Sequence, residues 1–436
     1  MKIPAVKGTR DFYPRQMAVR NFIIDGWKQA SIRNGFEEYD GPIFEYLTMY
    51  QVKSGQEIAE QLFSLTDRGG RQLAIRPEIT PTLARMVNQQ INSLPKPIKW
   101  FSVPRLCRAE RPQKGRLREF FQWNIDIIGE ESIIADAEVI FTTLDYLRKL
   151  GLTQEDIQVK ISSRKLLASV LTHIGIPAEK LAPLYVLLDK KAKLPSDTFR
   201  QLLAEQVTDK QTAEKILTFM EIKNTTEIKT KLGLDDGNDA YKDIEILFNC
   251  LNNQMAIGSF CVFDPSIVRG LAYYTGIVFE VHDIKGDLRA ICGGGRYDNL
   301  LADFGGPAIP ATGMGMGDCV LEILLEQKGL LDKKVFTKKT DYFVAVDLPQ
   351  ESSGSNAQAG DIAVKLAVEL RNKNYSAEFS YKPANLRKQL KYASENNAQN
   401  CIILGQKFKD ENKLIVKDMT TGDQYEIDCD KFLKQI

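Results

Sequence analysis

The residues best suited to chemistry lie between positions 105 and 126, where the chain reads RLCRAERPQKGRLREFFQWNID. Basic side chains gather around Glu110 and an apolar stretch follows, which predicts a strand, a loop and a second strand. Such a hairpin can aim several guanidinium groups at phosphates from one side. The formal net charge of the chain is only +1, so this concentration of charge is local. A solvated basic loop is the alternative interpretation. The basic residues are Arg105, Arg108, Arg111, Lys114, Arg116 and Arg118.

The spacing within this hairpin suits a nucleotide together with an amine. Arg108 and Glu110 are two positions apart, so they share one face of the expected strand. Phe120 can stack on a flat heterocycle, and Gln122 and Asp126 face the same way as Phe120. An arginine fork, a stacking ring and a downstream carboxylate suit ATP plus an amine-bearing substrate.

Two other places carry polar residues in an apolar setting. Glu78 and Thr80 follow a turn fixed by Pro77, although a glutamate at a helix N-terminus would explain Glu78 equally well. Arg269 stands beside Gly270 in an apolar segment. If buried, this arginine needs an anionic partner, whereas on an edge strand it needs none.

Two glycine-rich segments follow. GGGRYD at 293–298 either lets the backbone approach a ligand closely or simply makes a turn. GMGMGD at 313–318 lacks the last glycine of a GxGxxG pattern, which argues against a dinucleotide-binding loop.

The bulk composition is that of a soluble globular protein of two or three domains. The chain has 436 residues, 43% hydrophobic and 26% charged. Apolar runs are far shorter than a membrane span, and the first residues lack the apolar core of a signal peptide. Seven scattered cysteines without a CxxC pair, and only two histidines, argue against disulfide scaffolds and zinc sites. We therefore expect a cytoplasmic protein with no metal site of its own and no membrane association.

Periodicity predicts the elements that position these residues. Helices are expected over 15–34, 78–92 and 135–150, and strands over 72–76, 97–129 (the hairpin) and 267–281. Residues 164–255 have helical patterns and few strand signals. After a polar linker near 333–341, strands and helices alternate as in a small α/β domain with a largely parallel sheet. We expect a catalytic domain in two parts, 1–163 and 256–332, a helical insertion at 164–255 and an α/β domain at 337–436.

Taken together and in order, these motifs resemble those of class II aminoacyl-tRNA synthetases, specifically the histidyl family, over nearly the whole chain. KGTRDFYP at 7–14 is similar to the N-terminal signature, and the segment around Gly41-Pro42 to motif 1, a dimer-interface element. RAERPQKGRLREFFQ at 108–122 is very close to motif 2. VRGLAYY at 268–274 and GGRYD at 294–298 resemble two signatures peculiar to the histidyl family.

The resemblance implies an α+β fold: a class II antiparallel-sheet catalytic domain with a helical insertion, and a C-terminal anticodon-binding domain. It implies that histidine is activated with ATP, with Mg²⁺ bound through the nucleotide, and then transferred to tRNA(His) by a homodimer. Arg108 would hold the α-phosphate, Arg116 the γ-phosphate and Glu110 the adenine edge, while Phe120 would stack on the adenine ring. Arg269 would be a further cation near the α-phosphate.

The same resemblance implies the substrate and tRNA contacts. Glu78, Thr80 and Gln122 would bind the amino and carboxylate groups of histidine. The imidazole pocket would be formed by Asp126, Tyr273, Tyr274 and Tyr297. The loop from Pro112 to Gly115, with Gln113, Lys114 and Arg118, would touch the acceptor end of the tRNA.

Three positions depart from the family pattern. Ala272 replaces the acid of the VRGLDYY signature, and Phe121 replaces a common histidine. Val320 stands where motif 3 ends in an arginine that covers the adenine and reaches phosphate. No arginine occurs between Arg296 and Arg371, so a shift of register does not supply one.

Two other functions remain open beside the enzyme. The first is a non-catalytic paralogue resembling the regulatory subunit of ATP phosphoribosyltransferase, which binds histidine as a sensor and usually lacks the C-terminal domain. The second is a tRNA-binding sensor without activity. It would keep a basic C-terminal surface, formed by Lys382, Arg387, Lys388 and Lys391.

Overall fold

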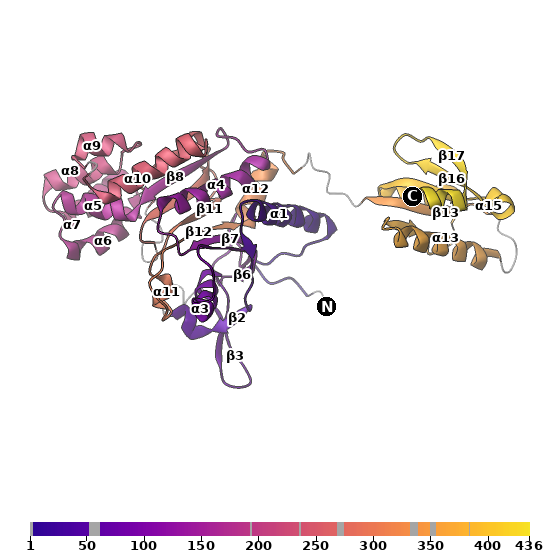
Figure 1. The fold of residues 1–436 in the computed structure, drawn as a ribbon, viewed down its shortest axis with the longest axis horizontal. Coiled ribbons are helices and arrows are strands. Elements are labelled where there is room, and N and C mark those ends of the chain that lie inside the picture. The colour runs from indigo at the N-terminus through magenta and orange to yellow at the C-terminus, as the bar shows by residue number, and fades with distance from the viewer. Residues whose placement is uncertain are drawn as a thin grey trace. The chain divides into compact units, whose positions relative to one another are not determined.

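The computed structural model describes residues 3–51, 62–191, 194–234, 237–267, 274–331, 339–348, 355–382 and 384–436. Two compact units make up the chain, Met1–Lys334 and Val335–Ile436 (Figure 1). Each unit has its own sheet and its own buried core. Among the described residues, none of the helices has the length and apolar character needed to cross a membrane.

The first unit is built on a large, mostly antiparallel sheet (Figure 1). Its strand order is β1-β5-β7-β12-β11-β10-β8-β9, with β6 paired to β7. Neighbours from β5 to β8 along this path are antiparallel, and only the end strands β1 and β9 join in parallel. The predicted α+β class with an antiparallel catalytic sheet is confirmed. The strands are β1 (Glu37–Glu38), β5 (Ile98–Ser102), β6 (Arg105–Cys107), β7 (Glu119–Ile128), β8 (Ile157–Ser163), β9 (Cys261–Phe263), β10 (Ile277–Asp283), β11 (Cys292–Arg296) and β12 (Ala311–Gly317).

Helices and a small second sheet support this sheet. The indoles of Trp27 and Trp123 stack with centroids 6.3 Å apart, and Tyr146 packs edge-on against Trp123 at 5.5 Å. These rings join α1, β7 and α4 in one apolar core, which fixes the strand that carries the expected site residues. The elements are α1 (Pro14–Arg33), α3 (Thr80–Gln90), α4 (Ile133–Lys149), α11 (Leu300–Asp303) and α12 (Asp318–Gln327), with β2 (Phe44–Tyr46), β3 (Phe63–Thr66) and β4 (Gln72–Ile75) in the order β2-β4-β3.

A run of helices lies between β8 and β9 in the chain. It leaves the sheet after Ser163 and returns at Cys261, and the two strands it connects pair side by side in parallel. The insertion therefore extends the first unit without interrupting the order of the sheet. Its helices are α5 (Arg164–His173), α6 (Ala178–Leu188), α7 (Ser196–Gln206), α8 (Lys210–Phe219), α9 (Thr226–Leu232) and α10 (Asp239–Asn249), followed by the π-helical η2 (Cys250–Gln254) and the 3-10 turn η3 (Gly258–Phe260).

The sequence-based element predictions need three corrections. The turn interpretation of the GGGRYD segment is wrong, because its glycines lie in β11, and the GMGMG segment forms the neighbouring strand β12 inside the sheet. In the described part of the strand expected over 267–281, residues 274–276 are not in a strand and β10 begins at Ile277, while residues 268–273 lie outside the described residues. Arg108 and Glu110 do not lie on a strand, because β6 ends at Cys107 and the chain turns towards Pro112.

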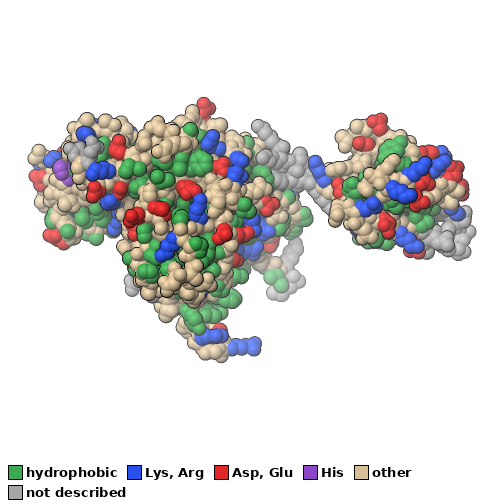
Figure 2. All heavy atoms as spheres, in the orientation of Figure 1, with side chains coloured by type: hydrophobic (Ala, Val, Ile, Leu, Met, Phe, Trp, Pro, Cys, Tyr) green, Lys and Arg blue, Asp and Glu red, His purple; other side chains and the backbone are tan. Residues whose placement is uncertain are grey.

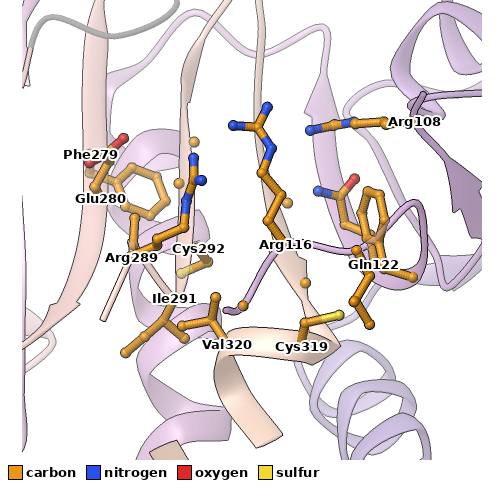
Figure 3. Close-up of a pocket in the computed structure, with 18 of the residues that line it drawn as sticks. Arg108, Arg116, Gln122, Phe279, Glu280, Arg289, Ile291, Cys292, Cys319 and Val320 are labelled. Carbon is orange, nitrogen blue, oxygen red and sulfur yellow. The ribbon is translucent and has the colours of Figure 1, made fainter. Parts of the chain in front are cut away.

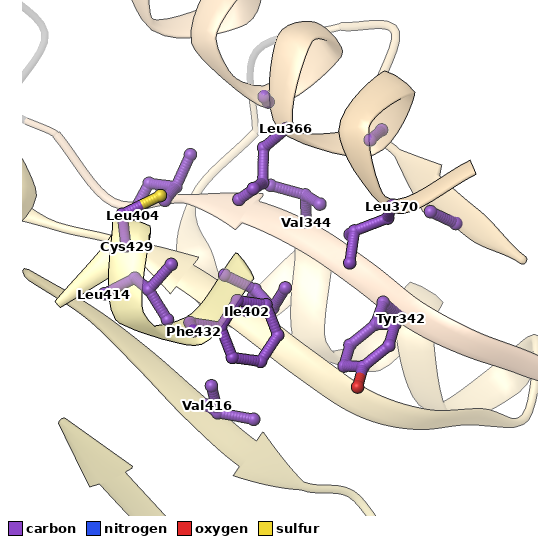
Figure 4. Close-up of a cluster of buried hydrophobic side chains, with 13 residues drawn as sticks. Tyr342, Val344, Leu366, Leu370, Ile402, Leu404, Leu414, Val416, Cys429 and Phe432 are labelled. Carbon is purple, nitrogen blue, oxygen red and sulfur yellow. The ribbon is translucent and has the colours of Figure 1, made fainter. Parts of the chain in front are cut away.

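The second unit is a five-stranded sheet in the order β14-β13-β15-β16-β17. The first three strands are parallel, as predicted, and the last two are antiparallel additions that the pattern did not reveal. Figure 4 shows Leu366 and Leu370 of one helix and Phe432 of another packed against Val344 and Ile402 of the sheet. The elements are β13 (Thr340–Val346), α13 (Ser355–Asn372), β14 (Ala377–Phe379), α14 (Leu386–Glu395), β15 (Ala398–Leu404), α15 (Gln406–Glu411), β16 (Lys413–Asp418), β17 (Gln424–Asp428) and α16 (Cys429–Gln435).

Candidate active site

A cavity of about 430 Å³ lies on the large sheet, between the 105–122 hairpin, strands β10 to β12 and the start of α12 (Figure 3). This volume falls within the range of small-molecule sites, roughly 300–1,000 Å³. Several residues expected from sequence to bind ATP or histidine line it together, five from the hairpin and one, Tyr274, from a distant part of the chain. These are Arg108, Glu110, Arg116, Phe120, Gln122 and Tyr274.

The polar floor of the site comes from β7, and β12 leaves room for it. In the antiparallel register, Gln122, Asn124 and Asp126 lie opposite Gly317, Gly315 and Gly313. A Cβ atom at Gly313 would come within 2.2 Å of Oδ1 of Asp126, and one at Gly315 within 2.9 Å of Nε2 of Gln122. The glycines of the GMGMG segment therefore clear the face over which the alternate polar side chains of β7 extend.

A buried carboxylate and a buried phenol meet beside this floor, and a partly buried phenol, that of Tyr274, lies near them. The hydroxyl of Tyr297 donates a hydrogen bond to Oδ1 of Asp126, and the two residues are 2% and 3% exposed. Burial raises the pKa of Tyr297 far above its usual value, and the charge of Asp126 raises it further. Burial also raises the pKa of Tyr274, with added effect from Glu78, Asp126 and Glu280. Both phenols therefore stay protonated at neutral pH and can donate hydrogen bonds.

Arg108 is held by its neighbours in a pose that faces the cavity. Its Nε donates to the carbonyl oxygen of Pro77 at 3.0 Å, and its guanidinium carbon lies 5.2 Å from the ring centre of Phe120. Burial lowers the pKa of Arg108, and the nearby charge of Glu78 opposes that shift. The guanidinium of Arg108 remains charged at neutral pH despite its burial, because the ordinary pKa of arginine is so high. The arrangement brings a fixed cation and an aromatic ring together at the cavity, with the charge of Glu78 nearby.

Arg116 and Glu110 form an ion pair across the turn of the hairpin. The side chain of Arg116 is 32% exposed and that of Glu110 is 9% exposed. The sequence assigned these two residues to opposite ends of ATP. In this structure they face each other instead, so a nucleotide must either separate the pair or bind beside it.

The turn itself is supported by the N-terminal segment. Gln113 and Arg116 exchange backbone hydrogen bonds of 2.9 Å, which leaves Gln113 and Lys114 exposed. Arg118, expected to touch tRNA, instead donates from Nε to the carbonyl oxygen of Glu110 at 3.1 Å, and its backbone N–H donates to the carbonyl oxygen of Gly8 at 2.8 Å. Gly8 has a φ of +89°, and a Cβ there would meet Pro112 at 2.6 Å. The GTRD segment thus packs against the turn and supports it through Gly8.

The remaining predicted residues divide into two groups. Thr80 is the first residue of α3, and Glu78 lies just before it, close enough to influence Arg108 and Tyr274 electrostatically. Arg269 and Tyr273 lie outside the described residues, as does Ala272. Their roles stay predictions.

Sequence reasoning missed residues on the wall formed by β10 and the segment before β11. Glu280 is 8% exposed and lines the cavity, and Nε2 of His282 lies 2.8 Å from its carboxylate. Arg289 lines the cavity from the connection that precedes β11. A charged residue at the centre of the apolar strand IVFEV was the available signal for Glu280. Arg289 carried no such signal, because it follows a polar loop.

Comparison with known proteins agrees with this geometry. A family model described as histidyl-tRNA synthetase matches residues 8–317, and one described as an anticodon binding domain matches residues 344–436. A histidine–tRNA ligase described as chloroplastic/mitochondrial, from Arabidopsis thaliana, is 36% identical over 421 residues, 97% of this chain and 84% of that protein. The histidine–tRNA ligase of Opitutus terrae is 36% identical over 427 residues, covering 97% of this chain and 95% of its own.

Solved structures share the fold. A histidyl-tRNA synthetase from Nostoc sp. PCC 7120 superposes with a TM-score of 0.81 at 21% identity, over 100% of this chain and 99% of that one. A protein titled ATP phosphoribosyltransferase regulatory subunit/histidyl-tRNA synthetase, from Bacillus halodurans, superposes with a TM-score of 0.75 at 21% identity, over 93% of this chain and 99% of that one.

The antiparallel sheet with its motif 2 hairpin and glycine-cleared floor, joined to a separate α/β unit, defines a class II aminoacyl-tRNA synthetase. Within that class, the match to the family model and the identity to curated relatives are specific. The chain belongs to the histidyl-tRNA synthetase family, which confirms the resemblance seen in its motifs.

Proposed function

We propose that this protein activates histidine with ATP to histidyl-adenylate and transfers the histidyl group to the 3′ end of tRNA(His). The observation that carries the proposal is the meeting, in one cavity, of the arginine-rich hairpin with Gln122 and Tyr274. The buried Asp126–Tyr297 pair adjoins these residues through strands β7 and β11 and is not among the described residues that line the cavity. The arginine-rich hairpin suits a triphosphate, and the carboxylate–phenol pair suits a polar ring. Family membership adds the same substrates.

At the ATP end, Arg108 and Arg116 neutralise phosphate charge, Phe120 stacks on the adenine and Glu110 accepts from its amino group. In the first step, the carboxylate of histidine attacks the α-phosphate and pyrophosphate leaves. The protein forms no covalent bond, so positioning and charge stabilisation supply the rate. Because Arg108 is fixed by Pro77 and Phe120, little reorganisation is needed when charge develops there.

At the histidine end, the Asp126–Tyr297 pair and Tyr274 present acceptors and donors to the two imidazole nitrogens. Both phenols are protonated and the carboxylate is buried, so an analogue without matching ring nitrogens would leave buried polar groups unpaired. Gln122, with Glu78 and Thr80 at the start of α3, would hold the amino and carboxylate groups. Tyr273 would complete the pocket.

Several finer assignments belong to this proposal. Arg269 would contact the α-phosphate, and Gln113 and Lys114 on the exposed turn would meet the tRNA acceptor end. Arg118 would act there through the turn, because its Nε already binds the backbone of Glu110. Mg²⁺ would arrive bound to the phosphates of ATP. Among the described residues, no group of three or more His, Cys, Asp or Glu is placed to hold a metal by itself.

We also infer a homodimer that uses the β2-β4-β3 sheet. Ile43, Phe44, Tyr46 and Leu65 are apolar and between 38% and 56% exposed. Figure 2 shows hydrophobic side chains at the surface over the part of the first unit where Figure 1 places β2 and β3. Gly41 and Pro42, the motif 1 residues, immediately precede β2.

The seven cysteines are free, which fits a cytoplasmic location.

Histidine-dependent exchange between ATP and pyrophosphate tests the function directly. The full-length protein should support exchange with histidine and not with the other amino acids. No exchange with any amino acid, together with histidine binding by calorimetry, would refute the catalytic proposal. The chain would then act as a histidine sensor.

A further inference from the structure

The candidate active site has a third arginine that no motif assigns. Arg108 and Arg116 enter the cavity from the hairpin, whereas Arg289 enters from the opposite wall, on the connection between β10 and β11. The connection is anchored just beyond Arg289, where the N–H of Ile291 donates to the carbonyl oxygen of Val281 at 2.8 Å. The base of this arginine is thus tied to the sheet.

The side of the cavity at α12 supplies no cation among its described residues. Val320, in the first turn of α12, is 8% exposed, and a Cβ at Gly115 would lie 3.0 Å from it. Figure 3 shows Val320 and Ile291 together at one side of the cavity, with the guanidinium groups of Arg289 and Arg116 both extending away from them in the same direction. Val320 and Ile291 can cover a flat ring. Arg289 and Arg116 then lie on either side of the space into which the phosphates of a nucleotide would extend from that ring.

The charge balance of the cavity favours a further cation for a polyanion. Glu110 already pairs with Arg116, so part of the positive charge of the hairpin is neutralised within the protein. Glu280, the other carboxylate among the described lining residues, accepts from His282. A triphosphate carries several negative charges, and planar guanidinium groups match phosphate oxygens well.

We propose that Arg289 binds the β- and γ-phosphates of ATP and supplies, from the wall of β10 and β11, the cation that Val320 cannot supply from α12. This proposal rests on the proposed function, because it names the way in which that site holds its nucleotide. Arg289 is a binding residue for ATP and for the departing pyrophosphate. It makes no contact with histidine.

Arg289 also borders a second cavity, lined by Lys160, His282 and Asp283. There it would join two other basic groups, with only one carboxylate among the described lining residues. If Arg289 served that cavity instead, its removal would leave the binding of ATP unchanged. Variants at position 289 therefore separate the two placements.

The test compares Arg289→Ala, Arg289→Lys and the control Lys285→Ala. Lys285 is exposed on the same connection and does not line either cavity, so its loss removes an equal charge without touching the site. In histidine-dependent exchange, Arg289→Ala should raise the KM for ATP on the order of 10- to 100-fold, the effect of removing one charged hydrogen-bonding partner. The KM for histidine should stay near that of the wild type, and Arg289→Lys should lose less.

Calorimetry with ATP and with AMP locates the contact. Arg289→Ala should weaken the binding of ATP and leave that of AMP unchanged, because AMP has no β- or γ-phosphate. An unchanged KM for ATP, or an equal loss of ATP and AMP binding, would overturn the assignment. Absence of exchange in the wild type would count against the proposed function alone, since the ATP–AMP comparison does not depend on turnover. Tryptophan fluorescence of each variant verifies the fold.

Discussion

At the scale of the residue, the pairing of Asp126 with Tyr297 is the feature to which the proposed function assigns the choice of substrate. Both side chains are buried, and they come from β7 and from the residue after β11. A buried carboxylate depends on its donors, because desolvation without hydrogen bonds costs several kcal/mol. The phenol therefore fixes the carboxylate and at the same time offers the ligand a defined neighbour.

Replacing Tyr297 by Phe should weaken histidine recognition selectively. The variant removes the donor that orients Asp126 towards the imidazole. We expect the bound state to lose about 1–3 kcal/mol relative to the free protein, which is roughly a 5- to 150-fold rise in the KM for histidine. The KM for ATP should change little. Exchange kinetics at varied histidine and varied ATP measure both values. Tyr185→Phe is the control, because Tyr185 is a buried tyrosine in α6, outside the cavity. An unchanged KM for histidine in Tyr297→Phe would remove the pair from the binding pocket.

At the scale of the element, Arg296 locks β11 to the start of α4. Its Nε and Nη2 donate to Oδ2 of Asp136 at 2.9 and 2.6 Å, and its Nη atoms also donate to the carbonyl oxygens of Glu130 and Ser132. Arg296 and Asp136 are buried. The arginine of the GGRYD signature thus has a structural role, holding β11 to α4, and the tyrosine beside it, Tyr297, donates a hydrogen bond to Asp126.

Breaking this buried pair from one side should destabilise the first unit. Asp136→Ala leaves the buried guanidinium of Arg296 with only the longer contact to Asp298, at 3.7 Å, as a carboxylate partner, and we expect a cost of about 3–5 kcal/mol. The three tryptophans, Trp27, Trp100 and Trp123, all lie in the first unit, so their fluorescence during urea unfolding reports that unit alone.

The exposed Lys242–Asp239 pair provides the control for this measurement. Lys242→Ala should change stability by less than about 0.5 kcal/mol. If Asp136→Ala unfolds at the same urea concentration as the wild type, Arg296 does not fasten the two elements.

The sequence predicted much of this architecture and part of the site. Strong periodicity located α1 and α4, and the order of residues in the motif 2 hairpin correctly indicated that Arg108, Phe120 and Gln122 face one cavity. The two glycine-rich strands were missed because glycine has poor strand propensity, and only the close approach of β7 explains its use in β12. Arg289 was missed because its role depends on a wall assembled from distant strands.

At the scale of the whole molecule, the chain is two units with separate cores. The second unit buries Val344, Ile402 and Phe432 within its own layers, so it has a hydrophobic core of its own. Exposed Arg387, Lys388 and Lys391 lie on or beside the solvent face of α14. Positive charge of this kind suits the backbone of a nucleic acid.

Removing the second unit should separate the two half-reactions. A protein of residues 1–334 keeps the whole candidate active site and should retain histidine-dependent exchange close to that of the full chain. Charging of tRNA should fall far more, because the anticodon contacts are lost. Exchange and aminoacylation assays on both proteins measure the two steps. Equal loss of both activities would mean that the second unit supports the catalytic fold.

The alternation of residues in β12 also limits how the specificity of this site can change. Gly313, Gly315 and Gly317 face the polar side chains of β7, while Met314 and Met316 are buried on the other side of the sheet. A side chain at Gly313 or Gly315 would collide with the polar side chains of β7, and larger side chains at Met314 or Met316 would disturb the core. Changes that alter the substrate are therefore tolerated better on β7 and on the walls of the cavity than along the middle of β12.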